Sequence, residues 1–414
     1  MIKDNKKKCS FCGELPPKTI IFDGINHSYI CANCVEKAHS ILQEEKTTTQ
    51  IDTEIKNLVL KKPSEIKKFL DQYVIGQEDA KKVLSVAVYN HYKRLLYNKP
   101  NNSEKSVEIE KSNIIIVGET GTGKTLIART IARMLDVPFC IADATVFTEA
   151  GYVGEDVESI LTRLLQAADY NVAKAEMGIV FIDEIDKVAR KNDNPSITRD
   201  VSGEGVQQAL LKLLEGSIAN VAPQGGRKHP DQKFIQVNTK NILFIAGGAF
   251  NNIEKKIALR LNTNIIGYNK KAKNIDKSNL LKYLSSQDLK SFGLIPELCG
   301  RFPVISHLHP LDHDALKRIL IEPKNALIKQ YKELFKMDNI ELEFSDDSIE
   351  YIVSKAISLH LGARGLRSII ENIMTDAMFE LPSKNLKKFL ISKEYAIEKF
   401  EISYISEIEG NLLA

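Results

Sequence analysis

A glycine-rich stretch at residues 118–125 restricts this chain to a small group of folds. It reads GETGTGKT and fits the pattern G-x-x-x-x-G-K-[S/T], whose backbone N–H groups cradle the phosphates of a nucleotide. An apolar run at 113–117 precedes it as a buried strand, and apolar residues at helical spacing follow it as far as Leu135. A strand, a tight turn and a helix N-terminus together form an anion site, because free N–H groups and the helix dipole point at the phosphates.

Two side chains of this stretch have separate tasks in nucleotide chemistry. Lys124 would reach the β- and γ-phosphates, and the Thr125 hydroxyl would lie on Mg²⁺. The alternative is a glycine-rich turn with a solvated lysine, which would not need the flanking strand and helix. The residues predicted to bind nucleotide here are Gly118, Glu119, Thr120, Gly121, Thr122, Gly123, Lys124 and Thr125.

A second apolar strand, at 178–182, ends in the carboxylates Asp183 and Glu184. Such a run is typical of a central parallel strand, whose C-terminal end is where ligands bind in open α/β sheets. Asp183 would hold Mg²⁺ through water, and Glu184 would orient and deprotonate the attacking water. The phosphate loop upstream favours this interpretation over a pair of surface acids.

Four of the six cysteines form two C-x-x-C pairs near the N-terminus. Their spacing is that of a tetrahedral four-thiolate zinc site. A segment of about 40 residues cannot bury enough apolar surface to fold alone, so a metal would supply the missing stability. Redox-active or disulfide pairs are the alternative, and such a zinc ribbon can also bind nucleic acid. The predicted ligands are Cys9, Cys12, Cys31 and Cys34, with Cys140 and Cys299 as small buried hydrophobes.

The overall charge gives no argument for an anionic partner, since 57 Lys and Arg face 54 Asp and Glu. No apolar run approaches the roughly 20 residues that span a bilayer. The N-terminus is basic but lacks the apolar segment of a secretory signal. We therefore expect a cytoplasmic protein that has no membrane or nucleic-acid partner.

The pattern along the chain predicts an α/β protein with a parallel central sheet. Further strands are expected at 137–141 and 241–246, and a mainly helical texture with one short strand at 340–344 begins near Pro310. A polar, Thr- and Lys-rich stretch separates the cysteine module from the rest. The expected segments are a zinc-binding module (1–46), a linker (47–63), a large domain (64–310) and a small helical domain (311–414).

Three loops carry side chains whose role the residues alone leave open. Tyr152 and Val153 lie between two glycines, either as a loop tip folded onto the core or as a grip for a partner. The basic triplet Arg227, Lys228 and His229 is either a solvated turn or a contact for peptide or phosphate. An apolar run, Ile265–Tyr268, stands in a polar, basic stretch and is a candidate interaction site.

Two arginines stand at domain limits. Arg301 ends the large domain, and Arg364 precedes the last long helix. Arginine suits the stabilisation of phosphate charge, in its own chain or from a neighbour. Taken alone, each would more often be a partner in a surface salt bridge.

Together these motifs resemble the ClpX family of AAA+ protein unfoldases, over nearly the whole chain from Cys9 to the last helices. The most specific parts are the four-cysteine module and the sequences GYVG (151–154), RKH (227–229) and GARGLR (362–367). The phosphate loop alone is shared with many unrelated ATPases. HslU, a related ring unfoldase, lacks the four-cysteine module.

For the nucleotide site, the resemblance implies an AAA+ P-loop ATPase with ATP, Mg²⁺ and Zn²⁺ as cofactors. Residues 118–125 would be the Walker A motif, and Asp183 with Glu184 the Walker B motif. Val74 and Ile75 would border the adenine. Arg301 would be the arginine finger that completes a neighbour's site, and Arg364 the sensor that couples nucleotide to the small domain.

For the partners, the resemblance implies a homohexameric ring that recognises tagged protein substrates, unfolds them through its pore and feeds them to the peptidase ClpP. Tyr152 and Val153 would grip the substrate in the pore, and residues 227–229 would line its entrance. Ile266, Gly267 and Tyr268 would dock to ClpP. The zinc-binding module would recruit substrates or adaptor proteins.

The chain departs from the family pattern at three places. Tyr268 replaces a phenylalanine, and its hydroxyl must stay hydrated or find a partner in an apolar cleft, which predicts weaker docking. Glu119 replaces a common proline, which bears on the stiffness of the loop. No polar sensor is found at the end of the 242–246 strand, which closes in Ala-Gly-Gly.

Two other classes of function compete with the unfoldase. A nucleic-acid remodeller with a zinc ribbon would show a basic stripe, which the near-neutral charge and the apolar Tyr152–Val153 tip disfavour. A scaffold that binds ATP only to assemble would lack Glu184 or Arg301, and both are present.

Overall fold

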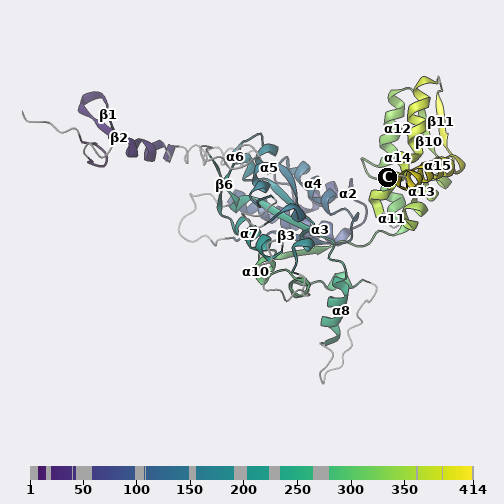
Figure 1. Cartoon of the computed structure of the whole chain (residues 1–414), viewed down its shortest axis with the longest axis horizontal. Coiled ribbons are helices and arrows are strands. Elements are labelled where there is room, and N and C mark those ends of the chain that lie inside the picture. Colours follow the sequence, from purple (N-terminus) through teal and green to yellow (C-terminus); the bar gives the residue numbers. More distant parts are fainter. Residues whose placement is uncertain are drawn as a thin grey trace, which may run out of the picture.

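The computed structural model describes residues 8–14, 20–39, 41–42, 58–97, 107, 109–148, 155–190, 203–222, 234–263, 279–359, 362–384 and 386–412. Figure 1 shows a large domain built around a sheet and a helical lobe that contains the C-terminal elements. The fold class predicted from the sequence is confirmed by this arrangement. The limits of the linker stay a prediction, because residues 43–57 lie outside the described part.

The large domain is organised by a five-stranded sheet with the order β4-β5-β8-β3-β9, and every neighbouring pair is parallel. In a parallel sheet all strands end at the same edge, so the ends of β3, β5 and β8 lie together. The strands are β3 (Ile114–Val117), β4 (Phe139–Asp143), β5 (Ile179–Asp183), β8 (Leu243–Gly248) and β9 (Val304–His307).

The two faces of the sheet belong to two separate hydrophobic cores. In β5, Ile179 and Phe181 pack into one core, while Val180 and Ile182 pack into the other. This follows from the alternation of side chains along a strand. The first core also contains residues of α2 (Pro63–Asp71), α3 (Glu78–Tyr97) and α4 (Lys124–Leu135). The second contains residues of α5 (Ser159–Ala167), α6 (Val172–Ala175), α7 (Glu204–Glu215), α8 (Ile253–Thr263), α9 (Ser286–Phe292) and α10 (Pro296–Gly300).

Short elements connect these layers. Strands β6 and β7 form an antiparallel pair beside the main sheet. The residue ranges of this pair are β6 (Ile218–Val221) and β7 (Ile235–Asn238). The single-turn helices of the large domain are η2 (Ala144–Val146), η3 (Ile185–Val188), η4 (Thr239–Asn241) and η5 (Leu280–Tyr283).

The C-terminal domain has its own core, to which its helices and two short strands contribute. The strand expected at 340–344 is present as β10, and it pairs in parallel with β11, which the sequence did not predict. Its elements are α11 (His313–Ile321), α12 (Leu327–Met337), β10 (Glu341–Phe344), α13 (Asp346–Ser358), α14 (Gly362–Glu380), η6 (Leu381–Ser383), β11 (Lys388–Ile391) and α15 (Lys393–Leu412).

The N-terminal module contains a short antiparallel hairpin of β1 (Ile21–Asp23) and β2 (Tyr29–Cys31), with η1 (Ile25–His27) between them. Residues 32–39 are helical. Among the described residues of the whole chain, no helix combines the length and the apolar character needed to cross a membrane.

Candidate functional site

A cavity of about 630 Å³ lies at the C-terminal edge of the sheet, and both domains contribute to its wall. Its volume is in the range of natural ligand sites. The structure brings eleven of the predicted site residues into this wall, from four separate stretches of the chain: Val74, Ile75, Thr120, Gly121, Thr122, Gly123, Lys124, Thr125, Asp183, Glu184 and Arg364.

The glycines of the loop at 118–125 have conformations that other residues rarely adopt. Gly121 and Gly123 have φ angles of 84° and 104°, in the left-handed region, and Gly123 is the N-cap of α4. A Cβ on Gly118 would lie 2.9 Å from the Cβ of Leu308. The loop therefore turns tightly from β3 into α4, as an N–H cradle for phosphate requires.

Lys124 is a buried ammonium, only 8 % exposed, at the start of α4. Its Nζ donates to the carbonyls of Gly118 at 2.6 Å and Glu119 at 2.9 Å. Burial lowers the pKa of Lys124, and the nearby Asp183 and Asp186 oppose this shift. A buried cation that reaches carbonyls beside a cavity fits an anionic ligand such as a phosphate.

Gly118 and Glu119 thus contribute carbonyls to Lys124 rather than atoms to the cavity wall. The Glu119 carbonyl also accepts from the Thr122 hydroxyl at 2.7 Å. These bonds lie inside the loop and restrain it at the position where the family has a proline.

Thr125 and Asp183 form the other end of the site. The Thr125 hydroxyl donates to Asp183 Oδ2 at 3.3 Å, across the gap between α4 and β5. A hydroxyl and a carboxylate side by side are hard oxygen donors, so the pair fits Mg²⁺. Glu184 follows in the left-handed region with φ 55°, and its side chain also contributes to the cavity wall.

The structure adds a carboxylate that the sequence analysis missed. Asp186, in η3, is buried, lines the cavity, and accepts from the backbone N–H of Ala249 at 3.1 Å. It therefore ties η3 to the chain just beyond β8. The sequence signal was the recurrence of an acid two residues after Glu184.

The Ala-Gly-Gly end of β8 has a steric reason. A Cβ on Gly247 would lie 2.6 Å from Cζ of Phe181, and one on Gly248 would lie 2.7 Å from Oδ1 of Asp186. A polar side chain does not fit at either position. A polar residue beyond the strand, Asn251, lines the cavity.

The small domain closes the cavity with α14. Arg364 lies in its wall, as do Arg367 and Glu371, which the sequence analysis missed. The three residues follow one another at intervals of three and four, so they share one face of the helix. This spacing was the signal available in the sequence.

Arg301 lies away from the cavity of its own chain. Its Nη2 donates to Oε1 of Glu215, at the end of α7, at 2.8 Å, and its carbonyl accepts from Nδ2 of Asn113 at 3.0 Å. The guanidinium is half-exposed. It is accordingly accessible to another molecule.

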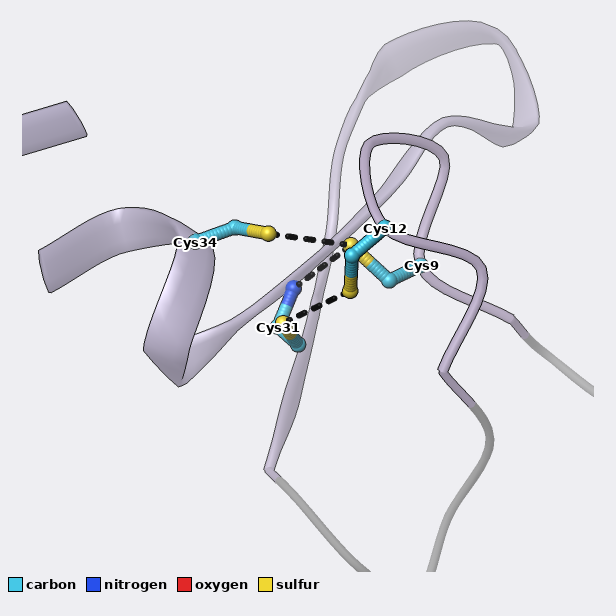
Figure 2. Close-up of side chains that lie close together, drawn as sticks. All are labelled: Cys9, Cys12, Cys31 and Cys34. Carbon is cyan, nitrogen blue, oxygen red and sulfur yellow. Dashed lines mark hydrogen bonds between the residues drawn. The ribbon is translucent and has the colours of Figure 1, made fainter. Parts of the chain in front are cut away.

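The four N-terminal cysteines converge (Figure 2). The Sγ atoms of Cys9 and Cys34 are 3.8 Å apart and those of Cys12 and Cys31 3.5 Å, and all four lie within 4.8 Å of one another. Tetrahedral zinc with Zn–S bonds of about 2.3 Å would separate its sulfurs by about 3.8 Å. The four thiols therefore fit a zinc ion, and none of them is in a disulfide.

Backbone hydrogen bonds favour the ionised form of the Cys9 thiol. Burial raises its pKa, but backbone hydrogen bonds at Cys12, Cys31 and Phe11 outweigh burial and lower the pKa to about 6. One of these is the Cys31 N–H, which donates to Cys9 Sγ at 3.3 Å. Such donors favour the thiolate form that binds metal.

Three groups of predicted residues lie outside the described part of the chain. They are the pore residues Tyr152 and Val153, the basic triplet Arg227, Lys228 and His229, and the docking residues Ile266, Gly267 and Tyr268. Their roles stay predictions.

Three family profiles match successive parts of the chain. The ClpX C4-type zinc finger matches residues 7–44. The AAA domain of the Cdc48 subfamily matches residues 109–305, and the C-terminal, D2-small domain of ClpB protein matches residues 311–390. The cysteine cluster lies within the first of these regions, and the cavity wall takes residues from the other two as well as from 73–75, which precede them.

Full-length relatives give the same result. The chain is 62 % identical over 413 residues to the protein named "ATP-dependent Clp protease ATP-binding subunit ClpX" of Bacteroides fragilis, covering 98 % of this chain and 99 % of the relative. The protein of the same name from Bacteroides thetaiotaomicron is 63 % identical, with 98 % of each chain covered. That from Porphyromonas gingivalis is 61 % identical, covering 95 % of this chain and 96 % of the relative.

Proposed function

This chain belongs to the ClpX family, and from that premise we propose that it is an ATPase that unfolds proteins and passes them to the peptidase ClpP. The observation that carries the proposal is the shared cavity. It combines the phosphate loop, the two acids at the end of β5 and an arginine of the small domain. ATP bound there contacts both domains, so its hydrolysis can move one against the other.

We infer a task for each predicted residue of the cavity wall from its chemistry and position. The loop N–H groups and Lys124 hold the phosphates of ATP. Thr125 and Asp183 would hold Mg²⁺, which would supply positive charge beside the phosphates. Glu184, just beyond the Asp183 carboxylate, orients the attacking water and takes its proton. Val74 and Ile75 supply an apolar wall for the adenine.

The second part of the proposal is a ring of six identical subunits. The exposure of Arg301 outside its own cavity supports a role at a neighbour's γ-phosphate. Arg364 lies on a helix of the small domain and in the wall of the cavity, which supports its role as a sensor of nucleotide.

Residues outside the described part of the chain complete the proposal. Tyr152 and Val153 grip an unfolded chain through apolar contacts that tolerate any sequence. Arg227, Lys228 and His229 line the entrance to the pore. Ile266, Gly267 and Tyr268 dock to ClpP, and the zinc-binding module recruits substrates and adaptors.

The test follows the fluorescence of a substrate protein, to which this chain adds no tryptophan emission because it contains no tryptophan. The protein is mixed with ATP and a stable fluorescent protein that carries a short unstructured tail, and loss of fluorescence is followed. Loss that needs both ATP and the tail supports the unfoldase. Tyr152→Ala should keep ATP hydrolysis and stop the loss of fluorescence.

The control is an untailed fluorescent protein, which should keep its fluorescence. A chain that leaves the tailed substrate folded, and whose ATP hydrolysis instead rises with DNA, would contradict the proposal. That result would favour the nucleic-acid remodeller.

A further inference from the structure

A short segment between α2 and α3 provides part of the cavity wall. Tyr73, Val74 and Ile75 line the cavity, while Gln77, two residues further on, does not. Gln77 is only 6 % exposed, and its φ angle of 58° lies in the left-handed region directly after Gly76, whose φ is 64°. A buried glutamine in this conformation is uncommon, because the left-handed region strains a residue that has a Cβ. The strain points to a function of its side chain.

The side-chain amide of Gln77 makes two hydrogen bonds to the backbone of one residue in the connection between the domains. Its Nε2 donates to the carbonyl of His309 at 2.8 Å, and its Oε1 accepts from the N–H of His309, also at 2.8 Å. His309 lies between β9, the last strand of the sheet, and α11, the first helix of the small domain. Both hydrogen-bonding groups of the amide are therefore used on this connection. We call the connection, residues 308–312, the hinge.

A second contact holds the other end of α11. The N–H of Lys324, just past α11, donates to the carbonyl of Gln72 at 2.8 Å. The segment 72–77 is thus bonded at one end to the chain before α11 and at the other to the chain after it. The cavity-lining residues Tyr73, Val74 and Ile75 lie between these two attachments.

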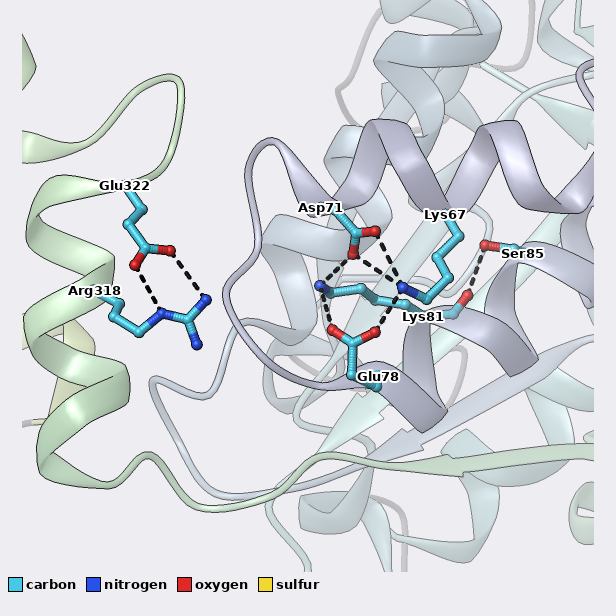
Figure 3. A network of polar contacts seen from close by, with 7 residues as sticks. All are labelled: Lys67, Asp71, Glu78, Lys81, Ser85, Arg318 and Glu322. Atoms are coloured by element: carbon cyan, nitrogen blue, oxygen red, sulfur yellow. Dashed lines mark hydrogen bonds and ion pairs between the residues drawn. The ribbon is translucent and has the colours of Figure 1, made fainter.

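Side chains of α2 and α3 pair with one another on either side of the segment (Figure 3). The buried Nζ of Lys81 pairs with Asp71 at 2.6 Å and Glu78 at 3.2 Å, and Lys67 pairs with Glu78 at 2.6 Å. These ion pairs join the end of α2 to the start of α3, on either side of the segment. A displacement of the segment is therefore transmitted to its attachments rather than absorbed within it.

We propose that Gln77 is a positioning residue that couples the adenine-binding segment to the hinge, so that nucleotide on residues 73–75 orients α11 and the small domain. The inference rests on the proposed ATPase and specifies how its site acts on the rest of the molecule. Gln77 does not line the cavity, and its side-chain amide is bonded to His309, so it acts through that residue.

The experiment measures the distance between the domains in the full-length chain. Spectroscopic labels are placed at the exposed positions Glu158 and Lys332, one in each domain. Distances are compared without nucleotide, with ADP and with a slowly hydrolysed ATP analogue. In the wild type, ATP analogue and ADP should give different distances, since the cavity wall belongs to both domains.

Gln77→Met keeps the size of the side chain and removes both hydrogen bonds. We expect it to reduce the distance change between ADP and the ATP analogue, because the coupling through His309 is lost while the small-domain residues of the cavity wall remain. Its ATP turnover should fall about tenfold, the effect expected from one or two net hydrogen bonds. Its affinity for ADP should change by less than about threefold, because the residues that touch nucleotide are intact.

Thr239→Val is the matched control. The Thr239 hydroxyl also makes two bonds to one backbone residue, donating to the Ser217 carbonyl at 3.1 Å and accepting from the Ser217 N–H at 3.0 Å. Thr239 is fully buried in η4, which precedes β8. It therefore lies at the opposite end of this strand from Gly248, which lines the cavity. Both variants should lower the melting temperature by a few degrees, but Thr239→Val should keep the distance change and the turnover.

Three results would overturn the inference. They are a distance change retained in full by Gln77→Met, a distance change reduced equally in Thr239→Val, and a wild type that hydrolyses ATP without any distance change. If Gln77→Met does not fold, Gln77→Glu takes its place, since it keeps the acceptor for the His309 N–H and loses only the donor. A wild type that does not hydrolyse ATP would instead refute the proposed function itself.

Discussion

Arg301 and Glu215 form an ion pair, with Nη2 2.8 Å from Oε1, on a part of the large domain that does not line the chain's own cavity. Both side chains are half-exposed, so the pair contributes only about 0–1 kcal/mol. Arg301 can therefore leave Glu215 at little cost when a stronger anion is offered. A γ-phosphate in a neighbouring subunit would be such an anion.

The location of Arg301 outside the cavity of its own chain predicts that a mixture of two inactive variants regains ATP hydrolysis. Arg301→Ala should lower ATP turnover roughly 10³-fold, as for other arginine fingers. Glu184→Gln should bind ATP and lower turnover about 10²- to 10⁴-fold, as for loss of a general base. Mixed before assembly, the two should recover part of the wild-type rate, measured as phosphate release. An arginine that acted within its own chain would give no recovery, because every site would lack one of the two groups.

His91 predicts a specific loss of stability in acid. Its Nε2 lies 3.0 Å from the carbonyl of Asn241 and so carries the proton, since a carbonyl only accepts. Burial, with the nearby Arg94 and Lys111, lowers the pKa of His91 to about 3. The unfolded chain, with a pKa of about 6.5, then binds more protons than the folded one between pH 3 and 6.5. Stability is full above that window and is lost as pH falls through it.

His91→Gln keeps a donor for Asn241 and removes the titration. From pH 7 to 5 the wild type should lose about 2 kcal/mol more stability than the variant. Scanning calorimetry of both proteins at the two pH values measures this difference. Parallel losses in the two proteins would show that His91 does not titrate as its burial predicts.

Gly247 predicts a steric limit in the centre of the sheet. Gly247→Ala would place a methyl group 2.6 Å from Cζ of Phe181, and should cost about 1–3 kcal/mol. Gly300→Ala is the control, because a Cβ there meets nothing within 4 Å, and it should be neutral or slightly stabilising. Thermal unfolding of the two variants compares them directly. Equal stability would mean that Phe181 moves aside freely.

The cysteine cluster predicts that metal removal acts locally. Cys34→Ser, or a strong chelator, should abolish zinc binding and expose the N-terminal module to protease. The melting temperature of the rest should not change, because its cores contain none of the four cysteines. Zinc content and protease protection are the measurements. The control variant Cys140→Ala, in the large domain, should bind as much zinc as the wild type. A loss of zinc from this variant would contradict the assignment.

The parts of the site that depend on local sequence were predictable. Gly118–Thr125 and the acids after β5 could be found because phosphate chemistry requires those residue types next to a strand and a helix. The fold class followed from the apolar strands in the same way. The structure adds that Gly118 and Glu119 hold Lys124 instead of lining the cavity.

What the sequence could not give are contacts between distant residues. Gln77 and His309 are 232 positions apart, and no periodicity connects a glutamine to a backbone that far away. The glycines after Ala246 looked like a missing sensor, since the ring of Phe181 that excludes a side chain lies on another strand. Strand β11 was missed because three of its four residues are apolar in succession, so the sequence does not show the alternation of exposed and buried side chains that the structure has.

The sulfur cluster of the N-terminal module has a consequence for how its surface can evolve. Phe11, Ile20 and Ile25 are 75 %, 71 % and 87 % exposed, so the fold of the module does not depend on hiding them. Where four metal–sulfur bonds supply the stability, replacing such a side chain changes the free energy of unfolding very little. Exposed residues of the module can therefore change during evolution to suit a new partner, while the ATPase domain stays the same.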